Sequence, residues 1–154
     1  MTRETLLANA PIPEDHIHPV PDTGTPEEAA AKYETVLKRV YGSDRLESSR
    51  FLFHVQFLGL GPDGHTASLI PGQPVLDERK RWVAAVTAGR AEPRVTLTYP
   101  TIESSHTIVF LVAGADKAAA LKAARAGDTR LPAARIVPLG DVVWFVDRAA
   151  AGTG

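Results

Sequence analysis

The sequence predicts an α/β domain built around an open sheet with parallel strands. Two predicted strands, residues 107–113 and 142–147, contain the continuously apolar runs Ile-Val-Phe-Leu-Val and Val-Val-Trp-Phe-Val, which are typical of strands covered on both faces by helices. An alanine-rich helix is expected between them, over residues 116–126, and Gly127 ends it. The order strand, helix, strand favours right-handed parallel crossovers. A chain of 154 residues that is 44% hydrophobic suffices for one such domain.

The first 24 residues predict only short elements. A helical turn is expected through Leu6 and Leu7. A proline-rich stretch follows, from Pro11 to Pro21, and we expect a short strand within it at residues 17–20.

An amphipathic helix is predicted directly after this stretch. Thr25 is suited to cap it, Pro26 to occupy its first position and Glu28 to complete a capping box. Apolar side chains then recur at steps of three and four residues, and Gly42 ends the pattern. We expect this helix to pack on the sheet with its charged side chains in solvent.

Three further segments predict strands, namely residues 51–58, 82–87 and 95–99. In open α/β sheets, ligands bind at the carboxyl ends of the strands. The loops after Leu58 and Ala113 are therefore the expected location of a functional site.

Charge and cysteine content exclude several classes of protein. The 17 Lys and Arg nearly balance the 18 Asp and Glu, so no basic excess indicates a nucleic-acid partner. The chain has no Cys, which excludes disulfides and thiolate metal sites and fits a reducing compartment. No stretch approaches the roughly 18 apolar residues of a membrane span. We expect a cytoplasmic protein without metal, cofactor, nucleic-acid or membrane partner.

The loop after the first predicted strand is rich in glycine. Gly59, Gly61 and Gly64 fit the pattern G-x-G-x-x-G, but Pro71 and Gly72 stop the long helix that a dinucleotide site requires. The glycines instead permit a sharp turn and close approach of the backbone to a small ligand.

This turn presents Asp63 and His65 at the end of a strand. Histidine suits proton transfer because its ordinary pKa lies near neutrality. An Asp two residues earlier is placed to orient the ring. The local pattern leaves a second interpretation open, in which His65 is a structural or merely exposed residue.

Residues 59–72, Gly-Leu-Gly-Pro-Asp-Gly-His-Thr-Ala-Ser-Leu-Ile-Pro-Gly, resemble the signature of the 6-phosphogluconolactonases, within the glucosamine-6-phosphate isomerase/deaminase superfamily. The similarity runs from about Leu6 to Ala151 and includes Arg-Val-Thr-Leu-Thr at residues 94–98 and Phe-Leu-Val-Ala-Gly at residues 110–114. It implies an open Rossmann-like sheet with helices on both faces. It also implies hydrolysis of 6-phospho-D-glucono-1,5-lactone to 6-phosphogluconate in the oxidative pentose phosphate pathway, without a cofactor.

The resemblance implies that His65 acts as general base on a water molecule, with Asp63 as its catalytic partner. It places Gly61, Gly64, Arg94 and Lys117 among the substrate-binding residues, and backbone N–H groups of the loop as candidates to stabilise an oxyanion. In the isomerase and deaminase branch a carboxylate follows the His by five residues. This chain has Ile70 at that position, which disfavours that branch.

Two cations are candidates to bind the phosphate of the substrate. Lys117 lies in the first turn of the helix expected at 116–126, where the helix dipole opposes a cation unless an anion binds beside it. Arg94 opens a strand and is suited to bidentate phosphate contacts. The alternatives are a surface lysine compensated by Asp116 and a surface arginine at a strand edge.

Members of this family begin with a further strand-helix-strand section that carries a phosphate loop, and no segment of this chain resembles it. We therefore expect one domain over residues 1–154, truncated at its amino end, with a flexible tail at residues 148–154. The missing section or a second copy of the chain is the expected protein partner. A catalytically deficient remnant or a sugar-phosphate-binding module remains the alternative function.

Overall fold

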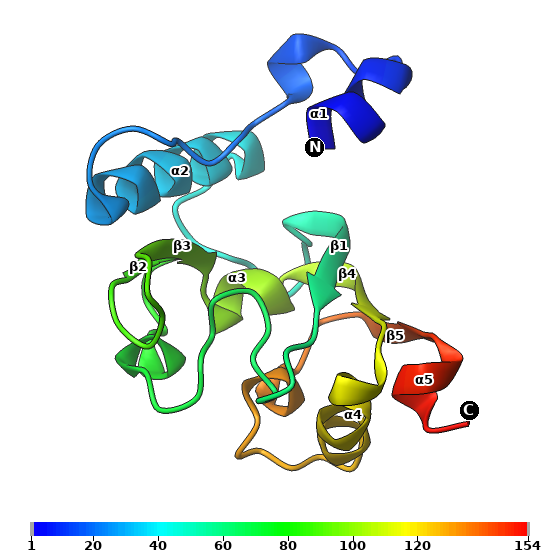
Figure 1. The fold of residues 1–154 in the computed structure, drawn as a ribbon. Helices are drawn as coiled ribbons and strands as arrows, with labels where there is room; N and C mark the ends of the chain where they lie inside the picture. Colours follow the sequence, from blue (N-terminus) through cyan, green and yellow to red (C-terminus); the bar gives the residue numbers. More distant parts are fainter. Residues whose placement is uncertain (1, 154) are drawn as a thin grey trace.

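The computed structural model describes residues 2–153 (Figure 1). Its strands are β1 (Phe53–Gly59), β2 (Val83–Val86), β3 (Arg94–Leu97), β4 (Ser105–Val112) and β5 (Asp141–Val146). Its α-helices are α1 (Thr2–Thr5), α2 (Pro26–Tyr41), α3 (Tyr99–Glu103), α4 (Ala118–Arg125) and α5 (Arg148–Ala151). Short 3-10 turns are η1 (Leu7–Asn9), η2 (Glu14–His16), η3 (Pro74–Asp77), η4 (Ala115–Lys117) and η5 (Pro132–Arg135). None of the helices described is long and apolar enough to cross a membrane.

The strands form a parallel sheet in the order β1-β4-β5 and a separate antiparallel pair, β2-β3. The predicted α/β class is confirmed, and each predicted strand after residue 50 is present with slightly shifted ends. The strand predicted at residues 17–20 is wrong, because this segment forms no ladder. Pro19 lies within it and has no N–H to donate to a neighbouring strand.

Helix α2 begins and ends where its capping residues predict. The N–H of Glu28 donates to Thr25 Oγ1 at 3.2 Å, and the N–H of Thr25 donates to Glu28 Oε2 at 3.1 Å. At the other end, Gly42 adopts a left-handed conformation with φ 77°. Helix α2 packs on the β2-β3 pair through a cluster that includes Leu37, Tyr41, Trp82 and Val83.

Glu34 joins α2 to β2 by hydrogen bonds as well as by packing. Its Oε2 accepts from the N–H groups of Trp82 and Val83 at 2.8 and 3.1 Å, and its Oε1 lies 2.7 Å from Lys38 Nζ. Burial raises the pKa of this carboxyl, but the hydrogen bonds from Lys38, Val83 and Trp82 outweigh burial and lower the pKa below its ordinary value. Glu34 is therefore an ionised link between the helix and the strand.

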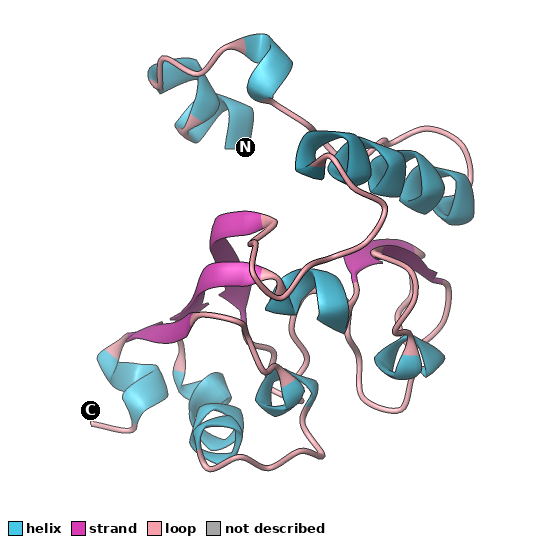
Figure 2. Ribbon diagram, turned by 180° about the vertical axis from the view of Figure 1, so that it is seen from behind, coloured by secondary structure: helices cyan, strands magenta, loops and turns pink. Residues whose placement is uncertain are grey.

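The larger core lies on the opposite side of the parallel sheet from α2 (Figure 2). Leu121 of α4 and Ala150 of α5 belong to this core together with Phe110, on which the Trp144 ring stacks with centroids 4.1 Å apart. Leu58, Ile108 and Val112 complete the sheet's contribution. Helices thus lie on both sides of the strands, as predicted.

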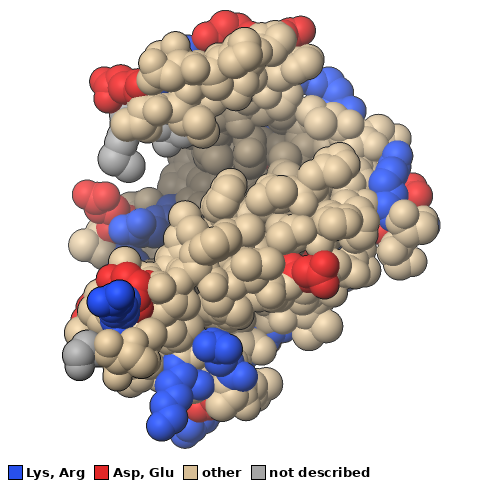
Figure 3. Space-filling model, turned by 90° about the vertical axis from the view of Figure 1, so that its right-hand side faces the viewer, with Lys and Arg blue, Asp and Glu red and all other residues tan. Residues whose placement is uncertain are grey.

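One face of the parallel sheet is nevertheless incompletely covered. By register and alternation, Val55, Phe57, Leu111 and Phe145 share this face, and their side chains are 52%, 66%, 53% and 60% exposed. Figure 3 shows a hollow between the amino-terminal segment and the body of the molecule, with few charged atoms around it. Helices flank the sheet on both sides, but on this face α2 covers β2, β3 and the start of β1, so Leu111 of β4 and Phe145 of β5 stay exposed.

The segment expected to be a flexible tail contains helix α5. Asp147 caps this helix, because its Oδ1 accepts from the N–H of Ala150 at 2.7 Å, and its carboxylate also accepts from the N–H of Gly114. Ala150 is 2% exposed. A cap and one buried alanine therefore dock most of residues 148–153 onto the core, while Gly154 lies outside the described residues.

Replacing Glu34 by Ala should lower the free energy of unfolding by about 1–3 kcal/mol, because the N–H groups of Trp82 and Val83 lose their acceptor. The lowered pKa of Glu34 means that its contribution is complete above the ordinary Glu pKa of about 4.3 and is lost as the pH falls through the folded-state value. Urea titrations at pH 7 and at successively lower pH measure both effects. Glu27→Ala, at an exposed position of the same helix, is the control, and equal losses in both variants would contradict the role of Glu34.

Candidate functional site

The loop after β1 is closed by its own backbone. The N–H of Gly61 donates to the carbonyl of His65, and the N–H of Gly64 donates to the carbonyl of Gly61, both at 2.9 Å. Thr66 Oγ1 donates to the carbonyl of Gly59 at 2.8 Å. The N–H groups of Gly61 and Gly64 are therefore already satisfied within the loop, which leaves these glycines a steric role at the site.

Gly61 is a position of close approach. A Cβ built there would collide with the imidazole ring of His65 and lie 2.8 Å from Asp63 Oδ1. Gly64 has φ +79°, and a Cβ there would lie 2.6 Å from Leu131 Cδ2. The absence of side chains at these two positions lets the ring fold back against the turn and lets the turn pack against η5.

Asp63 and His65 are brought together as the sequence predicts. His65 Nδ1 lies 2.5 Å from Asp63 Oδ1, and the backbone N–H of His65 donates to the same oxygen at 3.1 Å. The side chains of His65 and Asp63 are 28% and 39% exposed. Because an ionised carboxylate only accepts, the proton between them belongs on Nδ1. The lone pair of the neutral ring is then on Nε2.

Arg90 is a member of this cluster that the sequence analysis missed. It lies in the connection between β2 and β3, and its Nη2 donates to Asp63 Oδ2 at 2.9 Å. Burial raises the pKa of Asp63, but hydrogen bonds from Arg90 and His65 outweigh it and hold the pKa well below its usual range. In the sequence, Arg90 is recognisable only as a cation between two predicted strands. That position does not predict which side chain Arg90 contacts.

The two predicted phosphate-binding cations, Lys117 and Arg94, are not in contact with Asp63 or His65 in the described structure. Lys117 is in η4, after β4, and because β1 and β4 are parallel neighbours its segment leaves the same sheet edge as the glycine-rich loop. Its Nζ forms an ion pair with Asp116. Arg94 is exposed at the start of β3 and lines a separate hollow with residues 21–26. The described contacts do not join either cation to Asp63 or His65.

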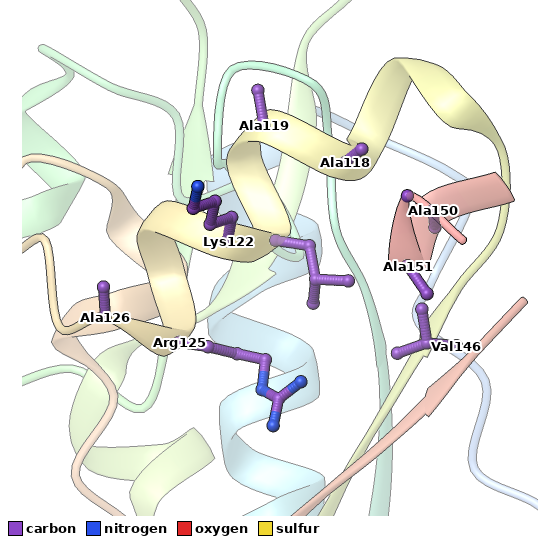
Figure 4. Close-up of a pocket in the computed structure, with 10 residues that line it drawn as sticks. Ala118, Ala119, Lys122, Arg125, Ala126, Val146, Ala150 and Ala151 are labelled. Atoms are coloured by element: carbon purple, nitrogen blue, oxygen red, sulfur yellow. The ribbon is translucent and has the colours of Figure 1, made fainter. Parts of the chain in front are cut away.

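A separate pocket lies between α4 and α5 (Figure 4). It has a volume of about 740 Å³ and is lined mainly by alanines, with Lys122 and Arg125 as its charged residues. None of the predicted site residues lines it. Within residues 2–153, no group of three or more His, Asp or Glu is arranged to hold a metal ion. The Asp63-His65-Arg90 cluster lies outside this pocket.

Replacing Gly61 by Ala should displace the His65 ring and break its contact with Asp63 without unfolding the chain, because the added methyl group occupies the place of the ring. Gly59→Ala is the matched control, since a Cβ there meets nothing within 4 Å. Carbon-proton NMR spectra of the His65 ring detect the displacement, and thermal unfolding shows whether each variant is folded. Unchanged ring signals in a folded Gly61→Ala variant would show that this close approach does not hold the ring.

Comparison with known proteins places the chain in a family. The sequence model described as glucosamine-6-phosphate isomerases/6-phosphogluconolactonase matches residues 1–144. The chain is 38% identical to the 6-phosphogluconolactonase of Homo sapiens, over 97% of this chain and 58% of that protein. It is 37% identical to the chloroplastic 6-phosphogluconolactonase 3 of Arabidopsis thaliana, over 96% of this chain and 47% of that protein.

Solved structures agree with the sequence comparison. The 6-phosphogluconolactonase of Thermotoga maritima aligns with a TM-score of 0.76 and 31% identity, over 94% of this chain and 62% of that one. The enzyme from Trypanosoma cruzi aligns with a TM-score of 0.77 and 30% identity, over 97% and 63%. The chain spans about half the length of the curated relatives that it matches. It belongs to the family of glucosamine-6-phosphate isomerases and 6-phosphogluconolactonases.

Proposed function

We propose that this chain hydrolyses 6-phospho-D-glucono-1,5-lactone to 6-phosphogluconate, in the oxidative pentose phosphate pathway of the cytoplasm. The observation that carries the proposal is the Asp63-His65 pair at the carboxyl end of β1. The names of the relatives, 6-phosphogluconolactonases at 37–38% identity, support the same substrate.

The reaction assigns one task to each member of the pair. His65 Nε2 takes a proton from water as the water oxygen forms a bond to the lactone carbonyl carbon. The tetrahedral intermediate collapses, the bond between this carbon and the ring oxygen breaks, and the imidazolium returns the proton to the departing oxygen. Asp63 keeps the proton on Nδ1 and stabilises the imidazolium while it exists. The product is the open-chain acid, which ionises in water.

The substrate's phosphate requires a cationic site, and Lys117 is the first candidate. Its segment leaves the same sheet edge as the glycine-rich loop and leads into the start of α4, where the positive end of the helix dipole favours an anion. Asp116, which pairs with Lys117, is the group that a phosphate would displace. Arg94, which is exposed at the start of β3, is the second candidate.

The isomerase and deaminase alternative is disfavoured by the environment of Ile70. This residue is 5% exposed within the larger core, at the position where that branch carries a carboxylate. An ionised group there would be buried among apolar side chains.

A sugar-phosphate-binding module without turnover is the second candidate function. The exposed sheet face favours it, because apolar side chains of Phe57, Leu111 and Phe145 lack the cover that a parallel sheet ordinarily has. We propose that a further section of the family domain, or a second copy of this chain, covers that face. Binding of 6-phosphogluconate without hydrolysis of the lactone would select this function over the first.

His65→Ala should reduce the rate of lactone hydrolysis by a factor of about 10²–10⁴, the contribution of a positioned general base. The purified chain is assayed by proton release, with the spontaneous hydrolysis of the lactone subtracted. His16→Ala, which changes an exposed His in η2, should retain full activity. A folded His65→Ala variant with the wild-type rate would remove His65 from the mechanism.

Lys117→Ala should raise KM at least several-fold and change kcat less, because phosphate contacts present in both the bound substrate and the transition state act on binding. Arg94→Ala tests the second cation in the same way. Lys122→Ala supplies a control on α4, outside the proposed phosphate site. An unchanged KM in both Lys117→Ala and Arg94→Ala would show that the phosphate binds elsewhere.

A further inference from the structure

The two carboxylate oxygens of Asp63 serve different partners. Oδ1 accepts from His65, through the ring Nδ1 at 2.5 Å and the backbone N–H at 3.1 Å. Oδ2 accepts from Arg90 Nη2 at 2.9 Å. Among the described residues, His65 and Arg90 are the ionisable groups that contact Asp63. The plane of the carboxylate is thus held from two sides.

Arg90 is itself held in place by its surroundings. Its Nη1 donates to the carbonyl of Gly89 at 3.1 Å, and two-thirds of its side chain is covered. Gly89 has φ +82°, and a Cβ there would lie 2.7 Å from Gln73 Nε2. The turn that carries Arg90 therefore lies against the segment that follows the glycine-rich loop, so its guanidinium meets Asp63 with little freedom to move.

The influence of Arg90 on His65 passes through Asp63. Arg90 Nη2 lies 3.1 Å from His65 Nδ1, but a protonated Nδ1 has no lone pair to accept from it. The positive charge of Arg90 and the negative charge of Asp63 also have opposite electrostatic effects on the His65 ring. The net effect of Arg90 is therefore to orient the carboxylate, which in turn orients the ring.

We propose that Arg90 is a positioning residue, which holds the Asp63 carboxylate in the plane where Oδ1 receives the Nδ1–H of His65. The effect of Arg90 on catalysis rests on the proposed hydrolysis. Its effect on the orientation of the Asp63 carboxylate does not. Without Arg90, Oδ2 loses its protein partner among the described residues, and the carboxylate is held only through Oδ1.

The first test needs no turnover. The carbon-13 shift of the Asp63 carboxyl is followed against pH in the wild type, Arg90→Ala, Arg90→Lys and the control Arg81→Ala, an exposed Arg before β2. Arg90→Ala should raise the pKa of Asp63 towards its ordinary value, Arg90→Lys should restore part of the difference, and Arg81→Ala should change nothing. An Asp63 titration that is the same in wild type and folded Arg90→Ala overturns the proposal.

The second test separates positioning from substrate binding. Arg90→Ala should lower kcat by about tenfold to hundredfold, the range typical when a partner that orients a functional His is lost, with little change in KM. In the background of Asp63→Asn the same substitution should have no further effect, because it acts through Asp63. A raised KM with unchanged kcat overturns the proposal and makes Arg90 a substrate contact. If the wild-type chain hydrolyses no lactone, the proposed function fails, and the carboxyl titration still decides the role of Arg90.

Discussion

The parallel pairing of β1 with β4 is the interaction on which the candidate site and the rest of the fold depend. It joins segments about fifty residues apart in the sequence and aligns Gly59 with Leu111, so both strands end at one edge of the sheet. The glycine-rich loop and the start of α4 therefore leave that edge together. The same pairing presents Ile108 and Phe110 to the larger core on one face and leaves Phe57 and Leu111 exposed on the other.

At this edge of the sheet, the arrangement of the candidate site depends on two glycines as well as on its functional side chains. Gly61 leaves room for the His65 ring against the backbone, and Gly64 leaves room for Leu131. Asp63 then connects the loop to Arg90, which arrives from a different strand pair. The cluster is thus assembled from two segments. The loop after β1 contributes Asp63 and His65, and the β2-β3 connection contributes Arg90.

The features that sequence analysis predicted well have local causes. Thr25, Glu28 and Gly42 define α2 because capping depends on residues within one turn of the helix end. Asp63 and His65 were predicted to meet because only Gly64 separates them, in a turn rich in glycine.

The features that were missed depend on distant contacts. Arg90 reaches Asp63 across 27 residues, and no pattern in the sequence relates the two positions. Helix α5 depends on the cap at Asp147 and on burial of Ala150, although the composition of this segment is that of a tail. The exposure of Leu111 and Phe145 was also missed, because a continuous apolar run predicts a buried strand without saying what buries it.

The central claim is that Asp63 fixes the tautomer of His65, so that the neutral form of the ring carries its proton on Nδ1 and its lone pair on Nε2. Long-range proton-nitrogen NMR correlations of the His65 ring, recorded with the imidazole in its neutral form, distinguish the two tautomers directly. We predict a protonated Nδ1 and an unprotonated Nε2. A neutral ring with its proton on Nε2 would contradict the account, because Nε2 would then have no lone pair with which to take a proton from water.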